Sequence, residues 1–300
     1  SPQGATVRPV SVYLVLIAGL CTSSSAAVLI RLCDAPSLVI AAYRLGISSL
    51  ILIPFAAFRT PTGLRELLSS HCITVLGSGF CLAFHFSFWI TSLAHTSVAS
   101  SGLLVTTNPI FVGIGTWVLL KEPVGSRLAI GTMIALAGTI LVTIGDHGAG
   151  NRALYGDALA LAGAVTMSAH LLIGRRVRST VSLLPYIAPV NTLAAFVVIG
   201  LCFIEGYSFS GYSPTTYILF AALAVGPQLI GHSSFNYALR HVSPSVIALF
   251  LLAEPVLSAA MAYIFLNELP PPLIYPGGTI ILVGIGLAVR PNRDNVRPAA

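Results

Sequence analysis

Apolar runs about twenty residues long follow one another along the whole chain, separated by charged residues, prolines or glycines. Each run is long enough to cross roughly 30 Å of hydrocarbon as an α-helix. The pattern therefore predicts an all-α integral membrane protein with ten transmembrane helices. Their expected bounds are 10–32, 37–58, 71–93, 97–120, 127–145, 154–174, 181–204, 215–239, 244–266 and 272–290.

The first run has some features of a signal peptide, because small residues at 23–27 follow an apolar stretch at 10–20. However, the apolar character continues to Leu32, and a second run follows at once. We therefore interpret the first run as a membrane-spanning helix.

The composition agrees with a membrane protein. Hydrophobic residues make up 56% of the chain and charged residues only 8%, whereas a soluble domain carries about 25% charged residues. The formal net charge is +6, but the basic residues are scattered singly, so we expect no nucleic-acid partner. The five cysteines form no CxxC pair and have no metal-ligand spacing, so neither a disulfide framework nor a metal or other cofactor is expected.

The charges between the runs indicate an orientation. If both termini face the cytoplasm, twelve of the fifteen Lys and Arg residues lie on that side, as the positive-inside rule requires. These twelve are Arg8, Arg59, Arg65, Lys121, Arg127, Arg175, Arg176, Arg178, Arg240, Arg290, Arg293 and Arg297. We therefore expect a multi-pass protein of the inner (cytoplasmic) membrane with both termini in the cytoplasm.

The chain contains an internal repeat. A shift of 146 positions without gaps superposes His95 on His241, Pro109 on Pro255, Glu122 on Glu268, Gly131 on Gly277 and Gly138 on Gly284. The expected repeats are 10–145 and 154–290, with five spans each. An odd number of spans inverts the second copy in the membrane, and inverted repeats are typical of transporters that alternate about a central site.

Both repeats end in a similar motif, in which a proline-containing helix is followed by a glutamate, a short loop and a glycine-punctuated helix. These segments, 103–142 and 246–288, resemble the end of an EamA domain of the drug/metabolite transporter (DMT) superfamily. Arg44 is similar to the family's second-helix arginine, which the second repeat lacks. The resemblance implies ten helices, cytoplasmic termini and transport of small organic solutes, most like the bacterial amino-acid and metabolite exporters.

Polar residues inside the spans are candidates for a substrate pathway, because they are costly where they face lipid. His85 and Trp89 lie four residues apart on one helix face. Gln228, His232 and Asn236 form a polar stripe in the eighth span. These residues, with Tyr43 and Asn108, are the expected substrate-binding set. The alternative is that they only hydrogen-bond neighbouring helices or, for the aromatic ones, anchor the membrane interface.

A second group of intramembrane residues has possible roles in coupling. Glu254 precedes Pro255 in the ninth span and could carry a coupling proton, satisfy backbone groups near the proline, or form an ion pair with Arg44. Asn108, its counterpart in the repeat, cannot titrate. Pro109 and Pro255 are expected to kink equivalent spans and are the candidate hinges.

These features predict a secondary transporter that exports amino acids, including aromatic ones, or similar small metabolites by alternating access. Another solute, such as a nucleoside, sugar or drug, is the alternative, and a channel is a third hypothesis. An intramembrane enzyme is disfavoured because the chain has no HExxH, paired carboxylates or GxSxG motif. The expected partners are the lipid bilayer, the small-molecule substrate and protons as a coupling ion, and the protein is a monomer or a homodimer.

Overall fold

The computed structural model describes residues 9–95, 98–144, 151–267 and 272–289, and every regular element in these ranges is helical. The first half contains α1 (Pro9–Ser24), α2 (Ala26–Leu32), α3 (Ser37–Arg59), α4 (Pro61–Ser70), α5 (Cys72–Ser92), α6 (Val98–Val105), α7 (Asn108–Leu119) and α8 (Ser126–Ile144). The second half contains α9 (Asn151–Arg178), α10 (Leu183–Ile204), α11 (Pro214–Leu223), the π-helix η1 (Ala224–His232), α12 (Ser233–Ala238), α13 (Pro244–Leu251), α14 (Glu254–Leu266) and α15 (Ile274–Val289).

The ten expected spans correspond to these helices. Within the described residues, seven stretches are long and apolar enough to cross a membrane. They are Ser11–Leu32, Ser37–Arg59, Cys72–Ser92, Leu154–Arg178, Leu183–Ile204, Pro214–Ala238 and Pro244–Phe265. Three shorter apolar helices, Asn108–Leu119, Ser126–Gly138 and Tyr275–Ala288, lie in the fourth, fifth and tenth expected spans. The protein is a multi-pass membrane protein.

Four expected spans are not single α-helices. The fourth is divided between α6 and α7, and the ninth between α13 and α14. Pro109 and Pro255 each lie in the first turn of the second piece, where the missing proline N–H leaves no helical hydrogen bond unmade. The first span is interrupted at Ser25, and the eighth contains the π-helix η1 around Pro227.

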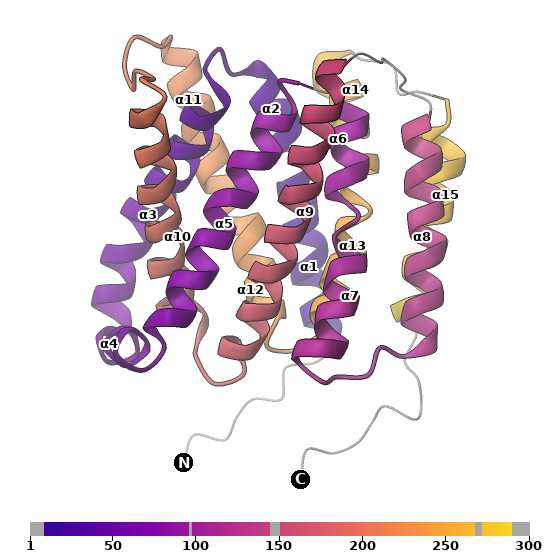
Figure 1. Ribbon diagram of the computed structural model, residues 1–300, viewed down its shortest axis with the longest axis horizontal. Coiled ribbons are helices and arrows are strands. Elements are labelled where there is room, and N and C mark those ends of the chain that lie inside the picture. Colours follow the sequence, from indigo (N-terminus) through magenta and orange to yellow (C-terminus); the bar gives the residue numbers. More distant parts are fainter. Residues whose placement is uncertain (1–8, 96–97, 145–150, 268–271, 290–300) are drawn as a thin grey trace.

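The short helix α4 was not predicted. Its sequence follows Arg59 and contains Gly63, Arg65 and Glu66, so it lacks the apolar run of a span. Leu67 is its buried anchor, while Arg65 and Glu66 are exposed. Figure 1 shows α4 lying across the end of α3, at an angle to the spans. This position suits a helix that lies at the membrane surface.

The helices form one bundle, with α8 and α15 together at one edge and α3, α4 and α10 towards the other (Figure 1). The helix pairs in contact include α8 with α15, α3 with α10, α5 with α9, α5 with α10, and α1 with η1. Exchanging the two halves maps the α8 and α15 pair onto itself, and likewise the α3 and α10 pair. It also maps the α5 and α9 pair onto η1 and α1. The contacts therefore have the symmetry expected of two related five-span halves.

The contact between α8 and α15 depends on glycine. A Cβ on Gly131 would lie 2.5 Å from the carbonyl oxygen of Gly284, and a Cβ on Gly138 would lie 2.6 Å from that of Gly277. The repeat shift converts the first pair into the second. Close backbone approach at small residues is a common mode of helix association in lipid.

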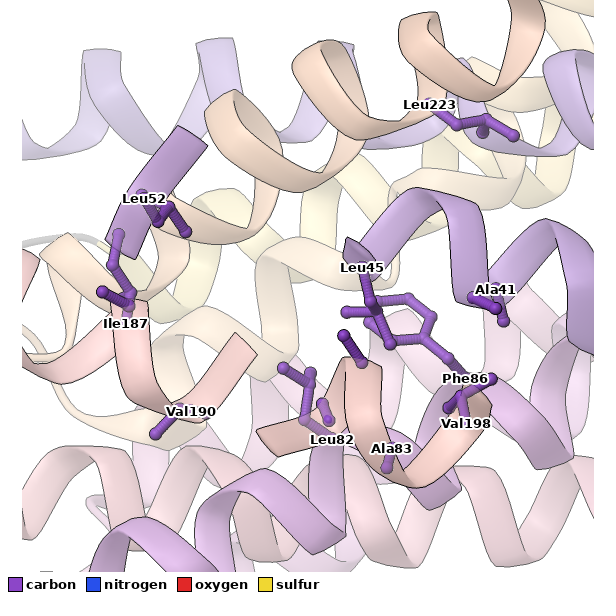
Figure 2. Close-up of a cluster of buried hydrophobic side chains, with 14 of the residues drawn as sticks. Ala41, Leu45, Leu52, Leu82, Ala83, Phe86, Ile187, Val190, Val198 and Leu223 are labelled. Atoms are coloured by element: carbon purple, nitrogen blue, oxygen red, sulfur yellow. The ribbon is translucent and has the colours of Figure 1, made fainter. Parts of the chain in front are cut away.

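The largest buried apolar cluster joins α3, α5 and α10, with Leu45, Phe86 and Val190 among its members (Figure 2).

Large apolar side chains also cover the outside of the bundle. Phe58 is 82% exposed and Ile73 is 85% exposed. Such side chains would be unfavourable in water, and they are the surface that a bilayer solvates.

Candidate functional site

A chain of buried polar side chains crosses the bundle between α3, η1 and α10. Nε of Arg44 donates a hydrogen bond to Oε1 of Gln228 at 2.9 Å, and Nε2 of Gln228 donates to Oδ1 of Asn191 at 2.7 Å. Nδ2 of Asn191 then donates to the carbonyl oxygen of Ile187 at 2.9 Å. Because Arg44 can only donate, it fixes the orientation of both amides in turn. Asn191 was not among the predicted site residues.

The guanidinium of Arg44 is held on a second side by an aromatic ring. Its central carbon lies 4.3 Å from the centroid of the Phe86 ring, and the residue is only 1% exposed. A cation over an aromatic face is attracted by the ring quadrupole, more strongly where water is excluded. Phe86 and Gln228 together give this charge a fixed position.

His85 and His232 lie close together beside the same ring. Their ring centroids are 6.4 Å apart, and that of His232 lies 5.0 Å from the centroid of Phe86. Nδ1 of His85 lies 3.0 Å from the carbonyl oxygen of Gly163. A carbonyl only accepts, so this nitrogen carries the proton, and Nε2 of a neutral ring is then an acceptor. His85 also stacks on Trp89, as their spacing predicted.

The polar stripe of the eighth span is present, but its members face different partners. Gln228 contacts Arg44 and Asn191, whereas His232 lies against Phe86. Asn236 donates from Nδ2 to the carbonyl oxygen of His232 at 3.0 Å. Gln228 and His232 both lie in η1, and π-helical segments occur frequently at functional sites.

Glu254 lies in the first turn of α14, where the partial positive charge of a helix N-terminus favours a carboxylate. Oε1 of Glu254 accepts a hydrogen bond from Oγ of Ser23 at 3.2 Å. Within the described residues, Glu254 makes no direct ion pair with Arg44, although the two charges interact through space. The direct polar partner of Arg44 is Gln228, and an ion pair of Arg44 with Glu254 stays a prediction.

Asn108 occupies the equivalent place at the start of α7, as the repeat predicted. It is 3% exposed, and its backbone carbonyl accepts a hydrogen bond from Oγ of Ser168 at 3.1 Å. Its side-chain Oδ1 has no partner. The starts of the two equivalent helices thus carry one carboxylate and one amide, both inside the bundle.

A second polar cluster joins α5, α9 and α10 and was missed in the sequence. Oγ of Ser78 lies 2.9 Å from Nδ1 of His170 and 2.6 Å from the hydroxyl of Tyr186. A Cβ on Gly174 would lie 3.1 Å from that hydroxyl and 3.6 Å from Oδ1 of Asn236, so this cluster lies near the stripe. The rarity of intramembrane histidine could have identified His170, as it did His85.

Tyr43 is not brought to the polar chain, although it is adjacent to Arg44 in sequence. Its hydroxyl donates to the carbonyl oxygen of Phe209, and its ring stacks on Phe220 with centroids 4.4 Å apart. The hydroxyl of Tyr217 also reaches the carbonyl of Phe209, at 3.4 Å. Successive residues of a helix point in different directions, so Tyr43 holds the loop between α10 and α11 while Arg44 faces inward.

At the opposite end of the bundle, Arg175 links three segments. Its Nε lies 3.4 Å from Oε1 of Glu122, and its Nη1 donates to the carbonyl oxygen of Leu239 at 2.8 Å. Nearby, burial and the charges of Arg240 and Arg178 lower the pKa of His241. Arginines therefore supply the positive charge at this end of α9.

Several buried polar atoms in these clusters have no hydrogen-bond partner. They are Nη1 of Arg44, Oδ1 of Asn108, Nε2 of His170, Nδ1 of His232 and Oδ1 of Asn236. Buried polar atoms in native proteins almost always have partners, whether protein, water or ligand. This concentration of unpaired donors and acceptors marks the bundle centre as the candidate substrate site.

The described residues contain no group of three or more His, Cys, Asp or Glu side chains that could hold a metal ion. The polar groups described for the centre are instead a guanidinium, imidazoles, amides, hydroxyls and one carboxylate. Such groups suit hydrogen bonding to a small organic solute.

Comparison with known families gives two matches in this chain. The sequence profile of the EamA-like transporter family matches residues 10–144 and again residues 154–290. Together the matches cover most of the sequence and all the polar residues described above.

Several curated proteins are similar over most of their length. An uncharacterized transporter of Archaeoglobus fulgidus is 23% identical over 227 residues, which are 72% of this chain and 75% of that protein. The uncharacterized transporter YdfC of Bacillus subtilis is 26% identical over 252 residues, which are 82% of this chain and 79% of YdfC. A probable terminal-alkyne amino-acid exporter of Streptantibioticus cattleyicolor is 22% identical over 210 residues, 69% of each chain.

A solved crystal structure has the same fold. It superposes with a TM-score of 0.79 and covers 94% of this chain and 98% of its own, at 20% sequence identity. The likeness extends over nearly the entire bundle, so the ten-span arrangement agrees with an experimental structure.

Proposed function

The chain belongs to the EamA-like transporter family, and from that premise we propose that it exports amino acids or similar small metabolites across the cytoplasmic membrane. Members of the family are transporters, so this protein is a transporter and not an enzyme. The named substrate class is supported by the resemblance to an amino-acid exporter. A related solute such as a nucleoside, sugar or drug is the alternative.

One structural observation carries the proposal. Side chains from both halves meet at the bundle centre, and several of their buried polar atoms lack partners. A bound solute would supply the missing hydrogen bonds. Transporters with inverted repeats commonly bind substrate near the midplane, between the halves.

We assign the substrate contacts to His85, Trp89, His232, Asn236 and Asn108. Gln228 holds the side chains of Arg44 and Asn191 in place through its two hydrogen bonds. The stacked rings of His85 and Trp89 offer an apolar wall next to nitrogen donors and acceptors. This combination suits a solute with a polar head and an apolar or aromatic body.

Alternating access would use the breaks in the helices. The segments 10–145 and 154–290 act as the two moving halves in this proposal, and the breaks before Pro109 and Pro255 are the hinges. Both breaks lie beside the centre, next to Asn108 and Glu254. Interrupted helices give a transporter flexible backbone at the binding site.

The orientation follows from the charges at the two ends of the bundle. The end of α3, the helix α4, the end of α9 and the loop after α12 lie at the same end of the bundle (Figure 1). They carry Arg59, Arg65, Arg175 and Arg240. In the proposed topology this end faces the cytoplasm. Glu254, half-buried in the ninth span, is the proposed site of the coupling proton.

The test is uptake by proteoliposomes of purified protein against a panel of labelled amino acids, nucleosides and sugars, with and without a pH gradient. We expect saturable uptake of at least one amino acid that unlabelled amino acids inhibit. Uptake of a nucleoside or sugar alone would favour the alternative substrate class. Movement that never saturates would contradict a carrier mechanism.

A further inference from the structure

Arg44 has an unused donor in the middle of the bundle. Its Nε is bonded to Gln228, but its Nη1 is buried and has no hydrogen-bond partner. The residue is only 1% exposed, so the guanidinium is buried in the bundle. A guanidinium presents its donors in a rigid planar fork, so a fixed Nε also fixes the direction of Nη1.

Among the described residues, no acid is in direct contact with this charge. The described neighbours of the guanidinium are the amide of Gln228 and the ring of Phe86. His85 and His232 also interact with it electrostatically. Glu254 is the acid that interacts with it through space, and that carboxylate is bonded to Ser23. Within the described part of the chain, this positive charge is thus buried without a carboxylate in direct contact.

Burying a charge without a partner is costly, and a protein retains such a charge where a ligand of opposite sign neutralises it. Building on the function proposed above, we propose that the transported solute carries a carboxylate that binds to Nη1 of Arg44. Gln228 and Asn191 act as positioning residues, because they hold the guanidinium in place.

The geometry favours a carboxylate over a phosphate group. Among the described residues, Arg44 is the cation with a buried, unpaired nitrogen, whereas a phosphate dianion needs several charged donors. The carboxylate would therefore neutralise the site with one charge. The rings of Phe86, His85 and Trp89 lie side by side next to it and would contact the body of the solute.

The experiment uses the intact purified protein and compares ligands with the same phenyl group that carry or lack the carboxylate and the amine. Binding of phenylalanine, 3-phenylpropanoate, phenylalaninamide and phenethylamine is measured by the rise in thermal unfolding temperature in detergent. We expect the two carboxylates to stabilise the protein at concentrations at least tenfold lower than the amide and the amine. Loss of a charged hydrogen bond produces a change of this size.

Variants then assign the effect to Arg44. Arg44→Lys keeps the charge but loses the fork, so carboxylate affinity should fall about tenfold. Arg44→Gln should remove the preference for carboxylates. Arg127→Gln, at the exposed start of α8, is the matched control and should bind as the wild type does.

The wild-type comparison does not depend on whether a variant folds. If the amine or the amide binds as tightly as the carboxylates, the assignment to Arg44 is overturned, while the transport function stands. If nucleosides or sugars are transported and none of the four compounds binds, the proposed substrate class fails as well. Unchanged carboxylate affinity in folded Arg44→Gln would also overturn the inference.

Discussion

Nε of Arg44 donates a hydrogen bond to Oε1 of Gln228 across 2.9 Å, which joins the second span of one half to the eighth span of the other. Nε2 of Gln228 in turn donates a hydrogen bond to Oδ1 of Asn191 at 2.7 Å. The contact therefore links the position of a buried charge to the packing of the two halves. It also gives a direct way to change the charge of the centre.

Gln228→Glu should keep the protein folded and abolish carboxylate binding. The new carboxylate would lie where Oε1 accepts from Arg44, so it would neutralise the guanidinium internally. Asn191 would turn its amide so that Nδ2 donates to the carboxylate, in place of the bond that Nε2 of Gln228 gave to Oδ1. Gln228→Leu should instead leave Nε of Arg44 and Oδ1 of Asn191 unpaired and lower the free energy of unfolding by about 1–3 kcal/mol. Thermal unfolding and ligand binding separate the two effects. Normal binding by Gln228→Glu would contradict the role given to Arg44.

The contact between α8 and α15 should not tolerate a methyl group. In Gly131→Ala, the Cβ would lie 2.5 Å from the carbonyl oxygen of Gly284, and relieving the overlap should cost about 1–3 kcal/mol. The matched control is Gly286→Ala on α15, where a Cβ meets nothing within 4 Å. Thermal unfolding in detergent should show a clear loss for the first variant only. Equal stabilities would show that the helices are not packed this closely.

Glu254→Gln should separate proton coupling from exchange. The amide can still accept the hydrogen bond from Ser23, but unlike a carboxylate it cannot bind and release a proton. We expect the variant to exchange substrate across proteoliposomes and to lose the acceleration by a pH gradient. Ser23→Ala, which leaves the carboxylate in place, is the comparison and should retain that acceleration. A full response to the gradient in Glu254→Gln would remove Glu254 from the coupling path.

Arg175 should matter more for stability than its ion-pair partner. The pair with Glu122 is partly exposed, so Glu122→Gln should change the free energy of unfolding by less than about 1 kcal/mol. Arg175→Gln also removes the donor to the carbonyl oxygen of Leu239, and we expect a loss of about 1–3 kcal/mol. Chemical or thermal unfolding of both variants provides the comparison. Equal losses would indicate that the carbonyl contact contributes nothing.

Tyr43→Phe should affect the outer loop rather than the binding site. The variant loses the hydrogen bond to the carbonyl of Phe209 but keeps the ring that stacks on Phe220. We expect substrate affinity within about twofold of the wild type, together with faster hydrogen exchange in residues 205–213. A large loss of affinity with no change in exchange would place Tyr43 in the substrate site, as its sequence position suggested.

The sequence predicted the spans well because twenty-residue apolar runs have one main physical solution in a bilayer. It also located the equivalent helix breaks, since Pro109 and Pro255 occupy matching places in the repeat. The helix α4 was missed because its polar composition resembles a loop. The extension of α9 to Arg178 was missed because charged residues end an apolar run without ending a helix.

The side-chain contacts were harder to predict, because helices that are apolar all round do not reveal which face meets which neighbour. Arg44 and Glu254 have opposite charges, so pairing was the natural hypothesis, but the sequence did not indicate that Gln228 of η1 accepts the hydrogen bond from Nε of Arg44. Ser78, His170 and Tyr186 come from three spans whose contact likewise depends on which helix faces meet. A sequence can identify such residues as unusual, but their grouping requires the structure.

The most direct test of a central carrier site is counterflow in proteoliposomes preloaded with an unlabelled amino acid, with wild-type protein and Gln228→Glu reconstituted in parallel. If the bundle centre is the transport site, the wild type will transiently accumulate the labelled amino acid above its external concentration. Gln228→Glu will then show none, although it remains folded. Equal accumulation by both proteins would contradict the account, because transport would not then depend on the free charge of Arg44.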